Sequence, residues 1–410
     1  PWPGARLQPS VGGATDTMKY RNLTICPLFL ASLALAPATT LAETAEESTE
    51  ETGSYVPLAL QNRPAGARSP GYDGALRLGL GYTSDDNYMF GQYNGLSEEG
   101  ATAIVNLQWQ DFSAADHYWK ISMTDLGLDT REAEITWGKA DKLKLNFGFD
   151  SQQQVRNDSG KTPFSGGDNQ QLPDNWVSGV STSDFATLDE SLRGFDRELD
   201  RDKLFAGIEM QLGDSWGLRS NLSYEEKEGD GDIGGAIYTS LTSGDAVLLR
   251  APVDYSTTEF DLGLSYSGGK LHLDGELAYS DFDNDDDILT WQNPYSSFGP
   301  RVGYPEGTGG LGVAPDNEHT SGRLTGHYLF SSKTRLQFDG SYALTSQDQS
   351  YLNYTVNDAL TVTEPVPNSD YDGEVATGTF RTRLMLRPMA KMNAEVFYKL
   401  RDRDYDADRD

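Results

Sequence analysis

The strongest constraint on the fold is a pair of neighbouring segments, residues 258–267 and 270–280, in which apolar residues recur at every second position. Gly268 and Gly269 separate the two segments. A period of two puts the apolar side chains on one face of an extended strand, and paired glycines are typical of a tight turn. The sequence therefore predicts a β-hairpin with one apolar and one polar face.

The length of the two hairpin strands indicates a location in a membrane. Each arm has about ten residues, which is enough for a tilted strand to cross the hydrocarbon core of a bilayer. Tyr266 and Tyr279 end the apolar rows, and the far end of the hairpin opens into the polar segment 281–290. A short turn at one end and a long loop at the other is the layout of an outer-membrane β-barrel.

The same alternation predicts thirteen strands in the whole chain. We expect them at residues 74–82, 102–110, 116–124, 131–138, 142–150, 203–212, 216–225, 258–267, 270–280, 320–330, 334–344, 375–386 and 391–400. Short connections are expected at 213–215, 268–269, 331–333 and 388–390, and long polar loops at 151–202, 226–257, 281–319 and 345–374. Short turns and long loops thus alternate through the second half.

This alternation of short and long connections distinguishes an outer-membrane barrel from a soluble β-sandwich. A soluble β-sandwich also has alternating strands, but it has no reason to place every long loop at one end. We therefore predict an all-β fold, a large antiparallel transmembrane β-barrel of the outer-membrane type.

Composition excludes other classes. A hydrophobic content of 37% and a mean hydropathy of −0.56 argue against a helical membrane protein, whereas only half of each barrel strand faces lipid. The net charge of −30 argues against a nucleic-acid partner. We interpret the excess acid as solvated loops.

The N-terminus predicts export. Residues 18–42 have a positive start, a short apolar core and small residues before a cleavage site after Ala42, which together indicate a signal peptide. We interpret residues 1–17 as a non-native or mis-called start, 43–70 as a flexible periplasmic lead-in, and 71–410 as the barrel.

Cysteine content limits the chemistry of the mature chain. Cys26 is the single cysteine, and it lies inside the predicted signal peptide. The mature chain then has no disulfide and no Cys-x-x-Cys-His motif for covalent haem attachment. We expect no cofactor of its own.

The C-terminal end predicts an incomplete barrel. Single-chain bacterial barrels use an even number of strands and close on themselves, because an open edge in lipid leaves backbone groups unpaired. The chain has thirteen expected strands and ends on the hydrophilic residues 405–410. We expect it to be the N-terminal portion of a barrel whose closing strands are missing.

Ordered sequence blocks between about residues 200 and 404 resemble the MtrB/PioB family of decahaem-associated outer-membrane barrel proteins. The blocks are 251–257 (APVDYST), 280–284 (SDFDN), 289–295 (LTWQNPY), 314–317 (APDN), 334–336 (TRL), 347–348 (QD), 351–355 (YLNYT), 387–388 (RP) and 398–404 (YKLRDRD). Two features differ from the family. Some members have a Cys-x-x-Cys pair near the mature N-terminus, whereas the mature part of this chain has no cysteine. Family barrels have on the order of two dozen strands, whereas thirteen are expected here.

The resemblance implies a scaffold function. Family members sheathe multihaem c-type cytochromes, so that electrons cross the outer membrane for extracellular metal reduction or iron oxidation. It implies a periplasmic multihaem cytochrome as partner, with or without an outer-surface one, haem carried by the partner, and no enzyme activity. A diffusion porin for small solutes and a secreted β-rich adhesin remain the alternatives.

Individual residues give few site candidates. The acidic segments 281–287 and 225–232 suit Ca²⁺ in composition but lack the residue order of an EF-hand, so we expect solvated loops. We predict no catalytic, cofactor-binding or metal-binding residue.

The four histidines and the large aromatic residues are assigned to the barrel wall. His117, His272, His319 and His327 are scattered without metal-ligand spacing, and His272 and His327 fall on the polar face, so we expect them to line the lumen. Interfacial girdles in the membrane are expected from Trp109, Trp119, Trp137, Trp216, Tyr224, Tyr266, Tyr279 and Tyr342.

Overall fold

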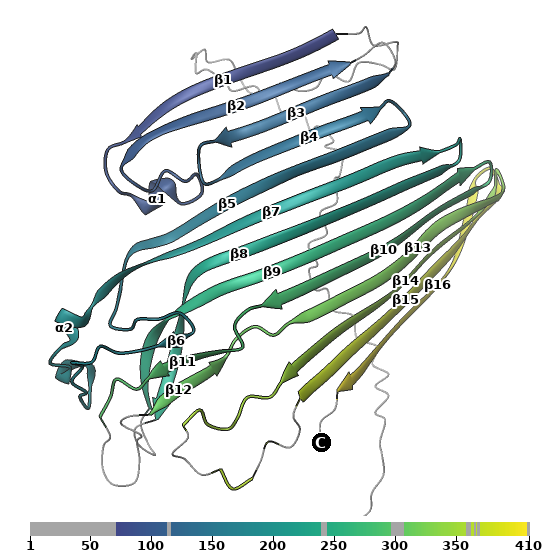
Figure 1. The fold of residues 1–410 in the computed structure, drawn as a ribbon. Helices are drawn as coiled ribbons and strands as arrows, with labels where there is room; N and C mark the ends of the chain where they lie inside the picture. Colours follow the sequence, from purple (N-terminus) through teal and green to yellow (C-terminus); the bar gives the residue numbers. More distant parts are fainter. Residues whose placement is uncertain are drawn as a thin grey trace, which may run out of the picture. The chain divides into compact units, whose positions relative to one another are not determined.

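The structure of the chain is a computed structural model (Figure 1). It describes residues 71–112, 116–238, 244–296, 307–357, 362–364, 366 and 370–407. The predictions for residues 1–17, the signal peptide at 18–42 and the lead-in at 43–70 lie outside the described residues.

Thirteen strands form one antiparallel sheet in which every strand pairs with its sequence neighbours. The strands are β1 (Gly71–Thr83), β2 (Gly100–Phe112), β3 (His117–Leu126), β4 (Arg131–Lys139), β5 (Leu143–Thr162), β7 (Arg193–Leu212), β8 (Trp216–Tyr238), β9 (Gly244–Gly268), β10 (Leu271–Asn284), β13 (Asn317–Ser331), β14 (Thr334–Ser350), β15 (Asp370–Met389) and β16 (Met392–Ala407). All thirteen predicted strands are confirmed, in the predicted order.

The remaining elements are short. A second, three-stranded sheet has the order β12-β11-β6 and consists of β6 (Asn169–Gln170), β11 (Ile288–Gln292) and β12 (Thr308–Gly312). The helices are α1 (Tyr88–Gly91), α2 (Leu188–Ser191) and the 3-10 helix η1 (Thr182–Asp184). Within the described residues, no helix is both long and apolar enough to cross a membrane.

Several strands extend far beyond the predicted ends. The polar segment 226–257 was predicted to be a loop, but β8 continues to Tyr238 and β9 begins at Gly244, with an unbroken register between them. The backbone alone makes the ladder hydrogen bonds, so pairing persists where the side-chain alternation has stopped. For the same reason, the loops predicted at 151–202 and 345–374 are shorter in the structure, where they span 163–192 and 351–369.

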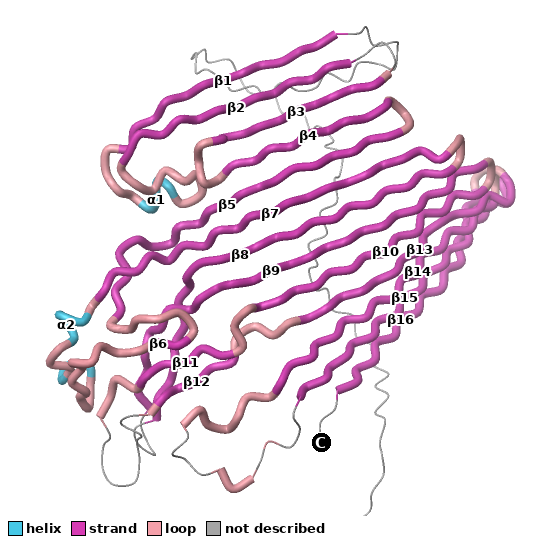
Figure 2. The backbone as a smooth tube through the Cα atoms, in the orientation of Figure 1, coloured by secondary structure: helices cyan, strands magenta, loops and turns pink. Residues whose placement is uncertain are grey.

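Tight turns gather at one end of the sheet, which we call the turn end (Figure 2). The turns are 140–142, 213–215, 269–270, 332–333 and 390–391. Gly213 (φ 71°) and Gly269 (φ 42°) supply left-handed backbone conformations there. The short connection predicted at 388–390 is found at 390–391, because a register shift after Leu386 accommodates Pro388 inside β15. The described residues of the long connections 84–99, 163–192, 285–316 and 351–369 lie at the opposite, loop end.

One face of the sheet is apolar across all thirteen strands. Directly paired residues share a face, and one row of pairs runs through Ile135, Phe147, Ala206, Leu222 and Phe260. Many of these side chains are exposed, including Phe147, Leu222 and Phe260. A continuous exposed apolar surface on a β-sheet suits contact with lipid hydrocarbon.

Aromatic residues border this apolar face at two levels. Near the turn end lie Trp109, Trp119, Trp137, Trp216 and Tyr266, and toward the loop end lie Tyr224, Tyr279 and Tyr342. Tyr224, Tyr279 and Tyr342 each stand eight positions beyond the first residue of their strand. At about 3.3 Å per residue, eight positions span roughly 26 Å along a strand, and a strand tilt of about 35–45° makes this roughly 20 Å along the bilayer normal, somewhat less than the ~25 Å apolar band of outer-membrane barrels. All eight predicted girdle residues lie on the apolar face.

The sheet has two edge strands in the described residues, β1 and β16, and each pairs with one neighbour. The expectation that further strands close the barrel stays a prediction.

Candidate functional site

The face opposite the apolar one is the candidate functional surface, and we call it the polar face. Near its middle, Asn146, Gly207, Asn221 and Asp261 occupy successive positions of one row across β5, β7, β8 and β9. The row consists of three polar side chains and one glycine, as expected of a wall that faces a water-filled lumen.

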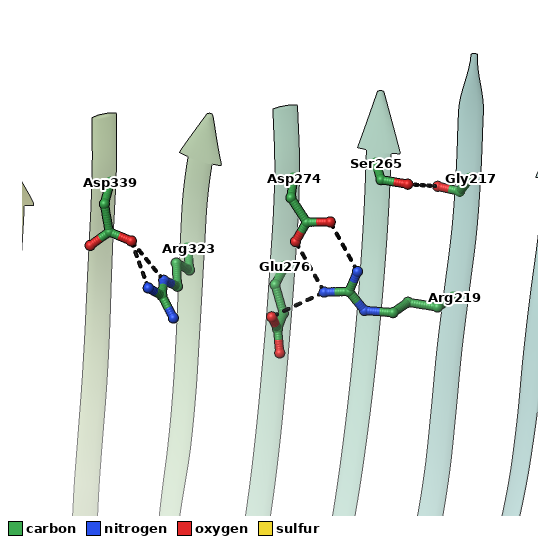
Figure 3. Close-up of polar contacts among 7 residues, drawn as sticks. All are labelled: Gly217, Arg219, Ser265, Asp274, Glu276, Arg323 and Asp339. Carbon is green, nitrogen blue, oxygen red and sulfur yellow. Dashed lines mark hydrogen bonds and ion pairs between the residues drawn. The ribbon is translucent and has the colours of Figure 1, made fainter. Parts of the chain in front are cut away.

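An ion-pair bridge spans three strands of the polar face (Figure 3). Arg219 on β8 donates from Nη1 to Asp274 Oδ2 at 3.1 Å and from Nη2 to Asp274 Oδ1 at 3.2 Å. Its Nη2 also donates to Glu276 Oε2 at 3.2 Å. Both acceptors lie on β10, so the guanidinium crosses over β9. The planar fork of arginine makes this two-pronged contact possible.

A glycine on β9 provides the space for this crossing. A Cβ at Gly263 would lie 2.5 Å from both Cζ and Nε of Arg219. The side chain of Arg219 therefore occupies the volume that any other residue at this position would need.

Further ion pairs tie neighbouring strands on the same face. Lys144 Nζ lies 2.8 Å from Glu209 Oε1. Arg323 donates to Asp339 Oδ2 from Nη2 at 2.6 Å and from Nε at 3.0 Å (Figure 3). These side chains are about one third to three fifths solvent-accessible. Because exposed pairs contribute about 0–1 kcal/mol each, they order the surface more than they stabilise the sheet.

Two histidines that lie far apart in the sequence occupy directly paired positions on neighbouring strands. His272 on β10 pairs with His327 on β13, and their ring centroids are 5.3 Å apart on the polar face. The prediction that both histidines lie on the polar face is confirmed. Their description as scattered is wrong for this pair, because the register between β10 and β13 brings His272 and His327 side by side. His319 also lies on this face, with Nδ1 2.9 Å from Thr345 Oγ1. His117 stacks on Trp137.

This pairing gives a direct test of register. We expect the double variant His272→Cys/His327→Cys to form a disulfide under mild oxidation, because paired residues of an antiparallel ladder have Cα atoms about 4.5–5.5 Å apart. The measurement is loss of free thiol together with a shifted band on a non-reducing gel. His272→Cys/Gln337→Cys is the control, since Gln337 lies one strand further away. Equal yields from the two variants would show that this register is wrong.

The loop end carries a second feature, a folded layer formed by residues 163–192, 285–296 and 307–316, which we call the loop layer. Its core consists of Phe164, Leu289, Trp291 and Tyr295 from the loops with Val247 and Leu249 from β9. Six of the eight buried apolar residues in the described chain belong to this core. Within the described residues, apolar burial is therefore concentrated in the loop layer and not in the wall.

Hydrogen bonds join the two loops to each other and to β9. The Leu172 amide donates to Gln292 Oε1 at 2.7 Å, and Trp176 Nε1 donates to the Pro294 carbonyl at 3.0 Å. Buried Gln170 donates from Nε2 to the carbonyl of Arg250 at 2.5 Å. These bonds connect segments about 80 to 120 residues apart in sequence.

Four of the family-like blocks meet at this layer. Asn284 donates from its backbone amide to Asp316 Oδ1 at 2.9 Å and from Nδ2 to the Ala314 carbonyl at 2.8 Å. The Asp285 amide donates to the carbonyl of Asp254 at 3.1 Å. The block 289–295 supplies Leu289, Trp291 and Tyr295 of the core. These blocks thus share a structural role in building the loop layer.

The alternation of β9 indicates which face the layer covers. Val247 and Leu249 are buried, whereas Leu248 between them is 61% exposed. Counting by twos from Glu259 on the polar face reaches Leu249 and Val247. The loop layer therefore packs on the polar-face side of the β8–β9 extension. The long polar loops predicted at 151–202 and 281–319 are thus present in part, but their described residues contribute a buried apolar core.

The acidic run at 281–287 is divided between β10 and the loop that follows it. Burial raises the pKa of Asp286 above its ordinary value of 3.8, and neighbouring carboxylates raise that pKa further, namely those of Asp168, Asp254, Asp285 and Asp287. No cluster of three or more His, Cys, Asp or Glu side chains arranged to hold a metal ion occurs in the part of the chain that the structure describes.

This carboxylate crowding predicts a pH dependence. A carboxyl whose pKa is raised on folding destabilises the fold at high pH, and that penalty disappears as pH falls toward 3.8. We expect Asp286→Asn to protect the loop layer from proteolysis at pH 8, with little difference from wild type near pH 4. The measurement is the cleavage rate of the loops between these pH values. A benefit that is equal at both pH values would contradict the electrostatic origin.

Comparison with known proteins identifies related sequences. The family model for outer membrane beta-barrel porins of the MtrB/PioB type matches residues 82–409. A curated relative, outer membrane protein MtrB of Shewanella baltica (strain OS185), is 27% identical over 263 residues, which are 63% of this chain and 36% of the relative. The match thus spans about a third of that relative.

Solved structures of outer-membrane proteins are more distant. OmpT of Vibrio cholerae is 10% identical with a TM-score of 0.24, and the match covers 81% of this chain and 86% of OmpT. The open form of the ferric-catecholate import receptor Fiu of E. coli K12 is 10% identical with a TM-score of 0.30, covering 82% of this chain and 61% of Fiu. TM-scores this low support no conclusion about the chain.

Proposed function

Because this chain belongs to the MtrB/PioB family of outer-membrane β-barrel porins, we propose that its polar face lines a lumen that sheathes a multihaem c-type cytochrome. The sheath would hold and insulate a haem chain, so that electrons cross the outer membrane.

The observation that carries the proposal is the sheet with one continuous apolar and one continuous polar face. Its thirteen strands already exceed the eight that give a barrel whose interior is filled by side chains. A wall of this size, polar inside and apolar outside, suits a lumen wide enough for a folded protein. Ion-paired side chains such as Arg219 and Asp274 provide that lumen with a structured lining.

In this proposal the redox chemistry belongs to the partner. The single cysteine of the sequence, Cys26, cannot form a Cys-x-x-Cys-His haem attachment motif. The partners are a periplasmic multihaem cytochrome, with or without an outer-surface one, and the barrel contributes position and insulation. Metal reduction and iron oxidation need the same conduit, so both directions of electron flow fit.

A diffusion porin is the second candidate, and the loop layer favours it. Porins constrict the lumen with a loop folded inward, and the loop layer packs on the polar-face side of the sheet through Val247 and Leu249. The secreted adhesin has no support, because the chain is an outer-membrane protein.

A pull-down separates the two candidates. Full-length tagged protein would be purified from outer membranes in mild detergent, and the eluate analysed by haem staining and absorbance spectroscopy. A stoichiometric c-type haem band is the result expected for a sheath. A colourless barrel that conducts ions in planar bilayers would overturn the sheath and support the porin.

A further inference from the structure

The polar face of the last two strands carries an unusual set of cations, which we call the basic stripe: Arg381, Arg383, Lys399, Arg401 and Arg403. The register pairs Arg381 with Lys399 and Thr379 with Arg401. The alternate positions Phe380, Val396, Tyr398 and Leu400 lie on the apolar face. All five cations therefore share the polar face, in a chain whose net charge is −30.

The stripe is only partly neutralised within the described residues. Arg383 Nε lies 3.2 Å from Glu395 Oε1, and the guanidinium of Arg403 lies 4.7 Å from the ring centroid of Tyr405. Arg381, Lys399 and Arg401 form no ion pair in the described part of the chain, and all three are exposed. Several other cations of the polar face differ, because Lys144 on β5, Arg219 on β8 and Arg323 on β13 each contact a carboxylate. Lys227 on β8 instead lies over the ring of Tyr255.

Protection of an exposed edge does not account for this arrangement. Charged residues do guard edge strands against unwanted pairing. Here the cations continue onto β15, which is paired on both sides, at Arg381 and Arg383. They are also confined to one face of each strand, whereas edge protection requires no such confinement.

The position of the stripe restricts what can neutralise it. The apolar face is the one that contacts lipid, so anionic lipid head groups lie on the wrong side of the wall. The complement of exposed guanidinium groups is a set of carboxylates, with which they form charge-assisted hydrogen bonds.

We propose that the basic stripe binds a carboxylate-rich surface of the protein that occupies the lumen. This inference rests on the proposed function and adds to it the chemistry of one contact. Charges arranged in this way accelerate association and fix the orientation of the bound protein, and their effect weakens as salt rises.

The test compares two triple charge reversals in the full-length protein. The stripe variant is Arg381→Glu/Lys399→Glu/Arg401→Glu. The control is Lys333→Glu/Arg387→Glu/Lys391→Glu, which changes net charge equally but alters cations at or beside the 332–333 and 390–391 turns, outside the stripe. Both are purified from outer membranes, checked for folding by heat-modifiable mobility, and assayed for haem per barrel at increasing NaCl.

The expected result is a selective loss of the partner. The folded stripe variant should lose bound haem about tenfold or more at ~0.15 M salt, and the control should keep it. Equal haem retention by wild type and stripe variant would overturn the inference while leaving the sheath intact. A wild type without haem would instead overturn the proposed function.

A cross-link identifies the occupant. The acidic segment 43–51 of this chain contains five glutamates and is the competing ligand for the stripe. A photoreactive benzoylphenylalanine in place of Arg401 should cross-link to the haem-carrying chain. Cross-links confined to the mass of the barrel itself would overturn the inference.

Discussion

Replacing Leu249 by alanine is expected to open the loop layer and leave the barrel wall folded. Leu249 is 0% exposed and belongs to the core with Leu289 and Trp291. Removal of a fully buried leucine side chain leaves a cavity and costs about 2–5 kcal/mol of unfolding free energy. The measurement is hydrogen exchange, which should accelerate in residues 163–192 and 285–296.

The neighbouring residue provides a matched control. Leu248 has the same chemistry on the same strand but is 61% exposed, so Leu248→Ala should change stability by no more than about 0.5 kcal/mol. The β8–β9 ladder should keep its protection in both variants, because its backbone bonds do not depend on the core. Similar exchange in the two variants would mean that the layer has no cooperative core.

The same pair of variants bears on the second candidate function. If the loop layer constricts the lumen, Leu249→Ala should raise single-channel conductance in planar bilayers, and Leu248→Ala should not. An unchanged conductance would place the layer away from the conduction path.

Periodicity accounts for the part of the fold that the sequence predicts well. Each membrane-crossing segment has to present apolar residues to lipid and polar residues to the lumen, so a period of two is visible in all thirteen strands. The same pattern assigns faces correctly to His272 and His327 and to the tryptophans. It carries no register information between strands, so the contact between the two histidines stays hidden.

Beyond the bilayer the constraint on side-chain pattern disappears. The extension of β8 and β9 consists of residues such as Glu228 and Asp230 whose side chains show no alternation, although their backbones pair with Asp254 and Pro252. The loop layer depends on contacts such as Gln170 with Arg250, 80 residues apart, which no local pattern reveals.

One local signal for the loop layer is present in the sequence. In the block 289–295, Leu289 and Trp291 alternate with Thr290 and Gln292, as in a short strand. The structure places this segment in β11, where both apolar side chains are buried. Apolar residues two apart inside a long polar loop thus indicate a folded loop.

The apolar face itself is tested by placing an arginine on it. We expect Leu277→Arg to reduce assembly of the barrel in the membrane. Leu277 is 58% exposed and pairs with Leu262 in the band between the aromatic levels. An arginine on the lipid face costs about 2–4 kcal/mol at the bilayer midplane and about 0–1 kcal/mol near the interfaces, and Leu277, two positions from Tyr279, lies between these limits. The measurement is the fraction of heat-modifiable, protease-resistant protein in outer membranes.

The adjacent residue makes the test specific to one face. Ala278 lies on the polar face, where its partners are Asp261 and Ser321, so Ala278→Arg gains an acidic neighbour in an aqueous environment. It should assemble like wild type. Because the two substitutions introduce the same side chain one position apart, a general intolerance of arginine in β10 would affect both equally. Normal assembly of Leu277→Arg together with failure of Ala278→Arg would mean that the assignment of the two faces is reversed.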